Sequence, residues 1–351
     1  MSARRLVPSL LGVGFVLLLR QVFGAPAAKQ VTKVTTLAGA GTAGFTNGVG
    51  RMAKFNHPMG LVVDHAGNFR VIVADTDNHR IRMITRAGTV TTIAGSEYPG
   101  LADGKGARAE FNHPSGVAVD RAGNIIVADT DNDRIRKIAP DGTVTTIAGS
   151  SMGYRDGKAL EARFDSPYAV AVDAANNIIV ADGMNRAIRR ITPSGLVTTI
   201  IGGFRKPAAV GIPGDVAVTS EGRVYVVNAL SHGLFAVGNN GDAAIVYPYF
   251  PYSAEHNMIG IALDRDGALI ASDDKHMIGK IADHTWSLIA GNGPGFVNGH
   301  ARAARFNRPS GIAVDARGMI YVADSDNHAI RIIDRFAKEE KRPTRPPLIR
   351  R

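Results

Sequence analysis

The sequence contains no cysteine. Disulfide bonds and cysteine-ligated zinc sites are therefore excluded. Small exported domains often depend on disulfides, but a chain of 351 residues can bury a sizeable apolar core without them. Packing and hydrogen bonding must therefore hold this fold together.

The body of the chain also lacks the features of a nucleic-acid-binding surface. The formal net charge is +10, but Arg4, Arg5 and Arg20 near the start and the basic segment 338–351 supply most of it. Aromatic residues make up only 6% of the chain. Recognition of single-stranded RNA combines basic and aromatic side chains on one surface. We therefore expect no nucleic-acid partner.

Helical periodicity and familiar catalytic motifs are absent as well. No stretch of the chain body repeats apolar residues at helical spacing, and the 40 glycines favour many tight turns. A GxSxG elbow, an HExxH pair and a P-loop are all missing from contexts that would support them. The sequence therefore predicts no catalytic residue, no metal site and no cofactor, and it favours a non-enzymatic role.

The first 27 residues are typical of a targeting segment. Arg4 and Arg5 precede the apolar run Leu6–Leu19, and the small residues Ala25 and Ala27 give a cleavage site before Ala28. The run is shorter than the about 20 residues of a membrane-spanning helix. We therefore predict a signal peptide over 1–27 and an exported protein, which is secreted, periplasmic or in the secretory pathway. An uncleaved signal anchor is the alternative, and only that case would involve a membrane.

The rest of the chain consists of six related units, which start roughly 50 residues apart. Four units are regular: FNHPMGLVVDHAGN from Phe55, FNHPSGVAVDRAGN from Phe111, FDSPYAVAVDAANN from Phe164 and FNRPSGIAVDARGM from Phe306. Two divergent units lie between them, IPGDVAVTSEGR from Ile212 and MIGIALDRDGA from Met258.

Each unit has the pattern of four short strands joined by tight turns. In the second unit the strands are expected at 116–120, 125–129, 134–138 and 143–149, where β-branched residues alternate between turns of the DG and GN type. A four-stranded sheet with two apolar faces buries both when such sheets stack around an axis. The fold class is therefore all-β, a six-bladed β-propeller.

The two ends of the repeat array predict how the ring closes. The sixth unit lacks its fourth strand, whereas VTKVTTLAG, which ends at Gly39, resembles that strand and precedes the first unit. We predict that this N-terminal strand completes the last blade. The propeller then spans 28–336, and the basic, proline-rich tail 337–351 is predicted to be disordered.

These motifs resemble the NHL repeat family through the Pro-Gly approach to an apolar strand, the VAD strand end and the following N-x-x-I-R. The resemblance covers about residues 33–334 and implies a six-bladed propeller. The family includes extracytoplasmic sensor domains, RNA-binding propellers and a zinc-dependent lyase, so it does not fix a function.

The lyase branch gives the alternative function, a metal-dependent hydrolase or lyase with its site in the channel. The zinc histidines of the peptide-amidating lyases follow the proline at the start of inner strands. No histidine stands at the matching positions of this chain, which are Met59, Ser115, Tyr168, Gly214, Ile259 and Ser310. The resemblance therefore carries no zinc ligand set over to this chain.

The candidate binding residues are His57, His113, Tyr168 and Arg308, which lie beside the prolines that open four inner strands. We expect them at one mouth of the channel, on the face that collects the long loops 95–114, 149–167, 247–258 and 291–309. A protein, peptide or glycan ligand is the expected partner there, because recognition commonly uses long loops on a rigid scaffold. The other interpretation is that the histidines only fill and hydrogen-bond the inter-blade loops.

Three further features admit both a structural and a functional interpretation. The repeated arginines Arg82, Arg136, Arg189 and Arg331 either form a basic face or lie across the neighbouring blade, paired with a repeated aspartate. The DxDN turns that begin at Asp75, Asp129 and Asp324 are calcium-loop fragments or simply tight turns. The aromatic segment Tyr247–Tyr252, in the irregular fourth and fifth units, either provides a stacking surface for a ligand or reflects neutral divergence of these repeats.

Overall fold

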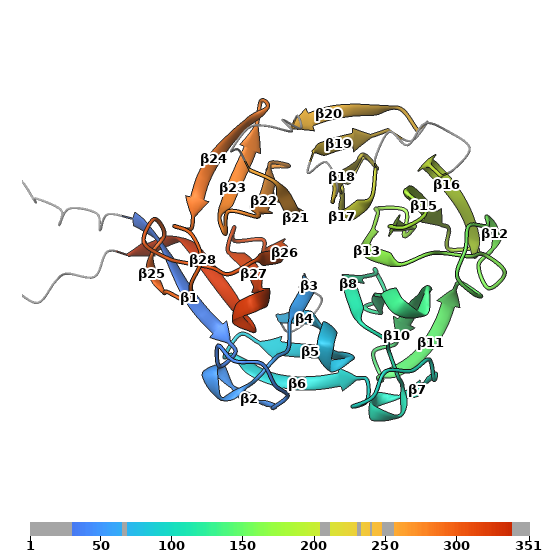
Figure 1. The fold of residues 1–351 in the computed structure, drawn as a ribbon, viewed down its shortest axis with the longest axis horizontal. Coiled ribbons are helices and arrows are strands. Elements are labelled where there is room, and N and C mark those ends of the chain that lie inside the picture. The colour runs from blue at the N-terminus through green and yellow to red at the C-terminus, as the bar shows by residue number, and fades with distance from the viewer. Residues whose placement is uncertain are drawn as a thin grey trace, which may run out of the picture.

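The structure is a computed structural model that describes residues 30–64, 69–203, 211–229, 233–238, 241–247 and 256–338. Six small antiparallel sheets surround a central axis, so the fold is the predicted six-bladed β-propeller (Figure 1). Helical structure in these ranges consists of single 3-10 turns. None of the described helices is long and apolar enough to cross a membrane.

Each blade runs outward from an inner strand at the axis. Blade 1 consists of β3(Pro58–Asp64), β4(Arg70–Asp75), β5(Arg80–Thr85) and β6(Thr89–Ala94). Blade 2 consists of β8(Pro114–Val119), β9(Ile125–Asp129), β10(Arg134–Ile138) and β11(Thr143–Ala148). Blade 3 consists of β13(Pro167–Val172), β14(Ile178–Asp182), β15(Ala187–Ile191) and β16(Leu196–Gly202). Blades 4 and 5 are β17(Pro213–Val218), β18(Val224–Asn228), β19(Leu234–Val237) and β20(Ala243–Tyr247); and β21(Met258–Leu263), β22(Leu269–Asp273), β23(Ile278–Ala282) and β24(Thr285–Ala290). Blade 6 is β26(Pro309–Val314), β27(Ile320–Asp324), β28(Ala329–Lys338) and β1(Gln30–Ala38).

Four blades carry a short fifth strand that the sequence did not predict. These strands are β2(Gly48–Val49), β7(Gly104–Lys105), β12(Gly157–Lys158) and β25(Gly299–His300), and they pair with the outer edges of blades 1, 2, 3 and 6. The 3-10 turns η1(Gly50–Met52) and η3(Gly106–Arg108) follow two of them, and η2(Thr76–Asn78), η4(Thr130–Asn132) and η5(Ser325–Asn327) occupy the DxDN turns. Two residues are too few for a strand pattern to be visible in the sequence.

The ring closes as predicted, because the N-terminal strand completes the last blade (Figure 1). β1 lies between β28 and β25, with Val34 opposite Ile333 and Thr35 opposite Ile332. The Val34 side chain is fully buried in a cluster with Phe306 and Ile333 that also contacts blade 5. The first and last parts of the described chain therefore share one sheet.

The buried arginines form structural ties, which confirms their pairing with the repeated aspartate. Each guanidinium contacts the aspartate that ends the second strand, and the Nη1–Oδ2 distances are 2.5–2.6 Å. The pairs are Arg82–Asp75, Arg136–Asp129, Arg189–Asp182 and Arg331–Asp324, and all eight side chains are fully buried.

The predicted direction of these arginines was wrong. Arg136 pairs within its own blade and also donates to Glu110 O and Ala102 O in the loop that leads into that blade, so it does not lie across the neighbouring blade. The Phe111 ring lies 5.2 Å from its guanidinium carbon. The strand register explains this direction. Arg136 on β10 lies opposite Val127 on β9, and β9 ends at Asp129, so the arginine and the aspartate belong to neighbouring strands of one blade.

Blades 4 and 5 have no arginine at the position that forms this arginine–aspartate pair. The register places Phe235 and Gly279 at the arginine position of these two blades. A Cβ on Gly279 would lie 2.3 Å from the Trp286 ring, which stacks on His256 with a centroid distance of 4.4 Å. His256 in turn contacts Asp273, so an imidazole and an indole occupy the space that an arginine fills elsewhere.

Candidate functional site

The central channel is a cavity that the described residues form. It has a volume of about 840 Å³ and is lined by all six inner strands, β3, β8, β13, β17, β21 and β26. Valine, isoleucine, leucine and alanine supply most of its wall because every unit repeats an apolar inner strand. A cavity of this size and polarity suits a small ligand or one segment of a larger ligand.

The inner strands approach so closely that one position holds glycine or alanine in five of the six inner strands. A Cβ on Gly60 would lie 2.3 Å from Ser115 O of the next blade, and one on Gly311 would lie 2.4 Å from Met59 O. Gly116, Gly260 and Ala169 hold the same position in three other blades. The width of the channel therefore depends on these small residues.

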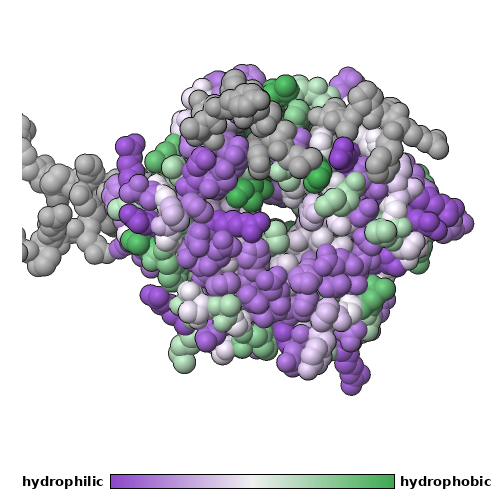
Figure 2. Space-filling view, in the orientation of Figure 1, coloured by the Kyte–Doolittle hydropathy of each residue, from purple (hydrophilic) through white to green (hydrophobic). Residues whose placement is uncertain are grey.

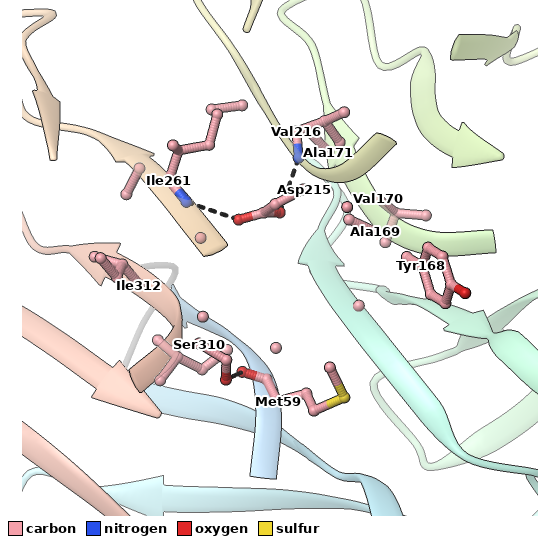
Figure 3. Close-up of a pocket in the computed structure, with 18 of the residues that line it drawn as sticks. Met59, Tyr168, Ala169, Val170, Ala171, Asp215, Val216, Ile261, Ser310 and Ile312 are labelled. Carbon is pink, nitrogen blue, oxygen red and sulfur yellow. Dashed lines mark hydrogen bonds between the residues drawn. The ribbon is translucent and has the colours of Figure 1, made fainter. Parts of the chain in front are cut away.

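Asp215 occupies this position in blade 4 and is the exception (Figure 3). Its Oδ1 accepts a hydrogen bond from Val216 N and its Oδ2 accepts one from Ile261 N of blade 5, each at 2.8 Å. Burial raises the pKa of Asp215 to about 7, and the two backbone N–H donors offset this only in part. The half-buried carboxylate has no ion-pair partner among the described residues.

Sequence analysis did not single out Asp215. The signal was nevertheless present, because an alignment of the six inner strands puts an ionisable residue where the other five have glycine or alanine. The pattern IPGDVAV reads simply as a divergent repeat, and only the spacing of the strands around the axis shows that the carboxylate reaches the channel.

The residues that precede the inner-strand prolines share one backbone conformation. His57, His113, Ser166 and Arg308 all adopt the left-handed conformation, with φ between 46° and 50°. Each of their backbone N–H groups donates to a side chain of the preceding blade. The acceptors are His328 Nδ1 at 3.1 Å, His79 Nδ1 at 3.2 Å, Asp133 Oδ1 at 2.9 Å and His276 Nδ1 at 2.8 Å, in that order.

The loops that lead into the inner strands and the DxDN turns lie on the same face. Asp77 N donates to Asn56 O at 3.2 Å, and Asp131 N donates to Asn112 O at 3.1 Å. Figure 2 shows an opening near the middle of the molecule, with hydrophilic side chains gathered below and to the left of it.

The four predicted site residues separate into two pairs. Tyr168 and Arg308 line the channel, whereas His57 and His113 do not. His57 Nε2 lies 3.1 Å from Asp326 of blade 6, and His113 Nδ1 lies 2.7 Å from Asp131 of its own blade. Burial, followed by the nearby Asp131 and Asp165, raises the pKa of the Tyr168 phenol above its ordinary value.

The described residues were compared with the predicted metal-binding and aromatic features of the sequence. Among residues 30–64, 69–203, 211–229, 233–238, 241–247 and 256–338, no group of three histidine, aspartate or glutamate side chains is placed to hold a metal ion. The first aspartate of each DxDN turn is already paired with the buried arginine of its blade. Of the aromatic segment Tyr247–Tyr252, Tyr247 is buried between blades 4 and 5, and the rest lies outside the described residues.

Comparison with known proteins identifies the repeats. The model of the NHL repeat matches residues 111–138 and 306–333, which are the second and sixth units. NHL repeat-containing protein 2 of Bos taurus is 29% identical over 309 residues, a match that covers 79% of this chain and 38% of that protein. The chain thus spans less than two-fifths of the length of this relative.

Solved structures share the fold at low sequence identity. An auxiliary nutrient binding protein from Bacteroides ovatus superposes with a TM-score of 0.66 at 17% identity, covering 89% of this chain and 78% of that one. Virginiamycin B lyase from Staphylococcus aureus superposes with a TM-score of 0.56 at 15% identity, covering 87% and 99%. At these identities the likeness shows the fold alone.

Proposed function

Because the chain belongs to the NHL-repeat β-propellers, we propose that it is a non-enzymatic binding module that holds a protein, peptide or glycan ligand at the mouth of its channel. The N-terminal segment 1–27 supports a site of action outside the cytoplasm. A channel ligand would enter from the face that carries the long loops.

One observation carries this proposal. The channel, of about 840 Å³, has apolar walls, and Tyr168 and Arg308 add an aromatic ring and a cation to its lining. Apolar surface with a few placed polar groups is the usual composition of a ligand site. The rigid ring of blades holds these residues in position without a ligand, which lowers the entropy lost on binding.

The fold itself favours neither binding nor catalysis. Solved structures that share the fold at low identity include both a nutrient-binding protein and a lyase, so function must be argued from the site. A metal-dependent hydrolase or lyase needs a ligand set, and the described residues supply no group of three candidate ligands. This is the reason to place the binding function first.

The test is a screen of the purified chain against peptide and glycan arrays, followed by mouth variants. Tyr168→Ala and Arg308→Ala should each weaken binding of an array hit at least about tenfold, as expected for aromatic and arginine anchors. Circular dichroism should show an unchanged fold, since neither side chain belongs to the buried core.

Arg121→Ala is the matched control. Arg121 is an exposed arginine in the turn between β8 and β9, on the opposite face. Loss of binding in this variant, with normal binding in the two mouth variants, would place the site on the wrong face. A screen without any ligand would count against the binding function altogether.

A further inference from the structure

We propose that Asp215 forms a cation subsite inside the channel, which receives the protonated amine of a ligand whose remaining body is apolar. This inference rests on the proposed binding function and names the chemical class of the channel ligand. It concerns a residue inside the channel, distinct from the long loops around the mouth.

The first argument is position. The other five inner strands have glycine or alanine where blade 4 has Asp215, so this is the one blade that places a functional group there. Each carboxylate oxygen accepts one backbone hydrogen bond, from Val216 N or Ile261 N. A carboxylate oxygen has two lone pairs, so both oxygens retain capacity for a donor in the channel.

The second argument is that blades elsewhere in the ring are joined without a charged side chain. Other blade interfaces are bridged by neutral hydroxyls: Ser115 Oγ donates to Tyr168 O at 2.6 Å, and Ser272 Oγ donates to Ser310 O at 2.7 Å. A purely structural role at blade 4 could use a serine in the same way. The carboxylate therefore needs an explanation beyond holding blade 5.

The third argument is electrostatic. An ionised carboxylate beside apolar walls is costly unless a cation compensates it. The structure supplies two backbone dipoles but no lysine, arginine or histidine as an ion-pair partner among the described residues. Burial raises the pKa of Asp215 to about 7, which is consistent with the lack of a cationic side chain beside the carboxylate. An ammonium group brought in by a ligand would supply it.

The surroundings favour an organic amine over a metal ion. Calcium takes six to eight oxygen ligands, and the described residues contain no group of three acidic or histidine ligands. The channel wall near Asp215 includes Val170, Val216 and Ile261, which suit an aliphatic or aromatic body (Figure 3). The apolar part of the ligand would then extend along the channel towards Tyr168.

The experiment compares two fluorescent probes of nearly equal size. Dansylcadaverine carries a terminal primary amine on a five-carbon chain, and N-pentyl dansylamide lacks that amine. The wild-type chain should bind the amine probe at least tenfold more tightly. Asp215→Asn should remove this preference and leave the binding of the neutral probe within about twofold.

The pH dependence gives a second readout. The amine stays protonated up to about pH 10, whereas Asp215 ionises near pH 7. Affinity for dansylcadaverine should therefore rise as the pH increases from 6 to 8, and affinity for the neutral probe should not. The Asp215→Asn variant should lose this pH dependence.

Two variants keep the result interpretable. Asp215→Gly introduces the glycine that the next inner strand has at the equivalent position, Gly260. The variant therefore removes the carboxylate and leaves a residue that the repeats of this chain already use there. Asp266→Asn removes an exposed carboxylate from the β21–β22 turn and should change nothing.

Equal binding of both probes by the wild-type chain would overturn the subsite and leave the binding function intact. Loss of both probes in folded Asp215→Asn would show that the carboxylate only shapes the channel, which also overturns the subsite. If neither probe binds the wild-type chain, the cation subsite is overturned, whereas the array screen alone decides the proposed binding function.

Discussion

His79 and His328 show how single residues hold neighbouring blades together. Nδ1 of His79 accepts a hydrogen bond from His113 N, and Nδ1 of His328 accepts one from His57 N. An imidazole nitrogen accepts only when it carries no proton, so these contacts require the neutral ring. Burial, followed by the charge of the neighbouring histidine, lowers the pKa of both side chains below the ordinary value.

These two histidines predict a loss of stability in acid. A histidine with a lowered folded-state pKa contributes stability that is complete above its unfolded pKa, near 6.5, and is lost as the pH falls through its folded pKa. The double variant His79→Asn, His328→Asn keeps an uncharged acceptor in a residue that tolerates the left-handed conformation. We expect the wild type to lose stability relative to this variant below pH 6.5, by at most about 1.4 kcal/mol per pH unit for each histidine.

Urea unfolding of both proteins at pH 8 and pH 5 measures this difference. The comparison with a variant is essential, because the buried aspartates Asp75, Asp129 and Asp182 have pKa values raised to about 6 and change stability in the opposite direction. Their contribution is common to both proteins and cancels. A constant difference between the two pH values would show that the contacts do not depend on protonation.

At the residue scale, recurrence made some predictions possible and concealed others. The pairing of the buried arginines with a repeated aspartate was predictable because both recur at fixed spacing in four units. Their direction was not, since it depends on which strand lies next to the aspartate. Asp215 was missed because its importance arises from the close approach of strands that belong to different blades.

At the scale of elements, β1 is the strand whose removal should matter most. It forms the outer part of blade 6, and without it the edge of β28 would be unpaired. Unpaired edges associate with other chains. Deleting residues 28–40 should therefore abolish cooperative unfolding or cause aggregation, whereas deleting 339–351 should leave the unfolding midpoint nearly unchanged, since that tail is polar and rich in proline.

A point variant separates the role of β1 from a general effect of truncation. Val34→Asp places a charge in a fully buried position and should cost at least about 2 kcal/mol of unfolding free energy. Thr35→Asp, at the exposed neighbouring position, should cost about 0.5 kcal/mol or less. Equal effects of the two substitutions, measured by urea unfolding, would contradict the closure that packing of Val34 provides.

The strand order was predictable at this scale because each unit repeats the same alternation and the same turns. The missing strand of the sixth unit and the extra strand before the first unit complement each other, and the structure pairs them. The fifth strands β2, β7, β12 and β25 could not be predicted, because each consists of two residues in a glycine-containing loop.

Across the whole molecule, the ring is less regular than its symmetry suggests. Blades 1, 2, 3 and 6 share the buried arginine–aspartate tie and a fifth strand on the outer edge. In the described part of the chain, blades 4 and 5 have four strands each and place Phe235 and Gly279 at the arginine position. The unusual channel residue, Asp215, belongs to this same sector.

This asymmetry predicts that blades 4 and 5 open before the rest of the ring. Local opening is easiest where few buried contacts and hydrogen bonds must break. The outer strand β20 has exposed side chains at Ala243, Ala244 and Ile245, whereas β11 of blade 2 is bounded by β7, and its neighbouring strand β10 carries the buried Arg136.

Hydrogen exchange followed by mass spectrometry tests this prediction. Peptides that cover β19, β20 and β24 should exchange at least about tenfold faster than those that cover β10, β11 and β16, which corresponds to about 1.4 kcal/mol. Intrinsic amide exchange rates depend on the neighbouring side chains, so the measured rates are first corrected for sequence, and the remaining differences report local stability. Uniform protection in all six blades would mean that the ring opens only as a unit, in which case Trp286, His256 and Phe235 stabilise their blades as well as the buried arginines stabilise the other four.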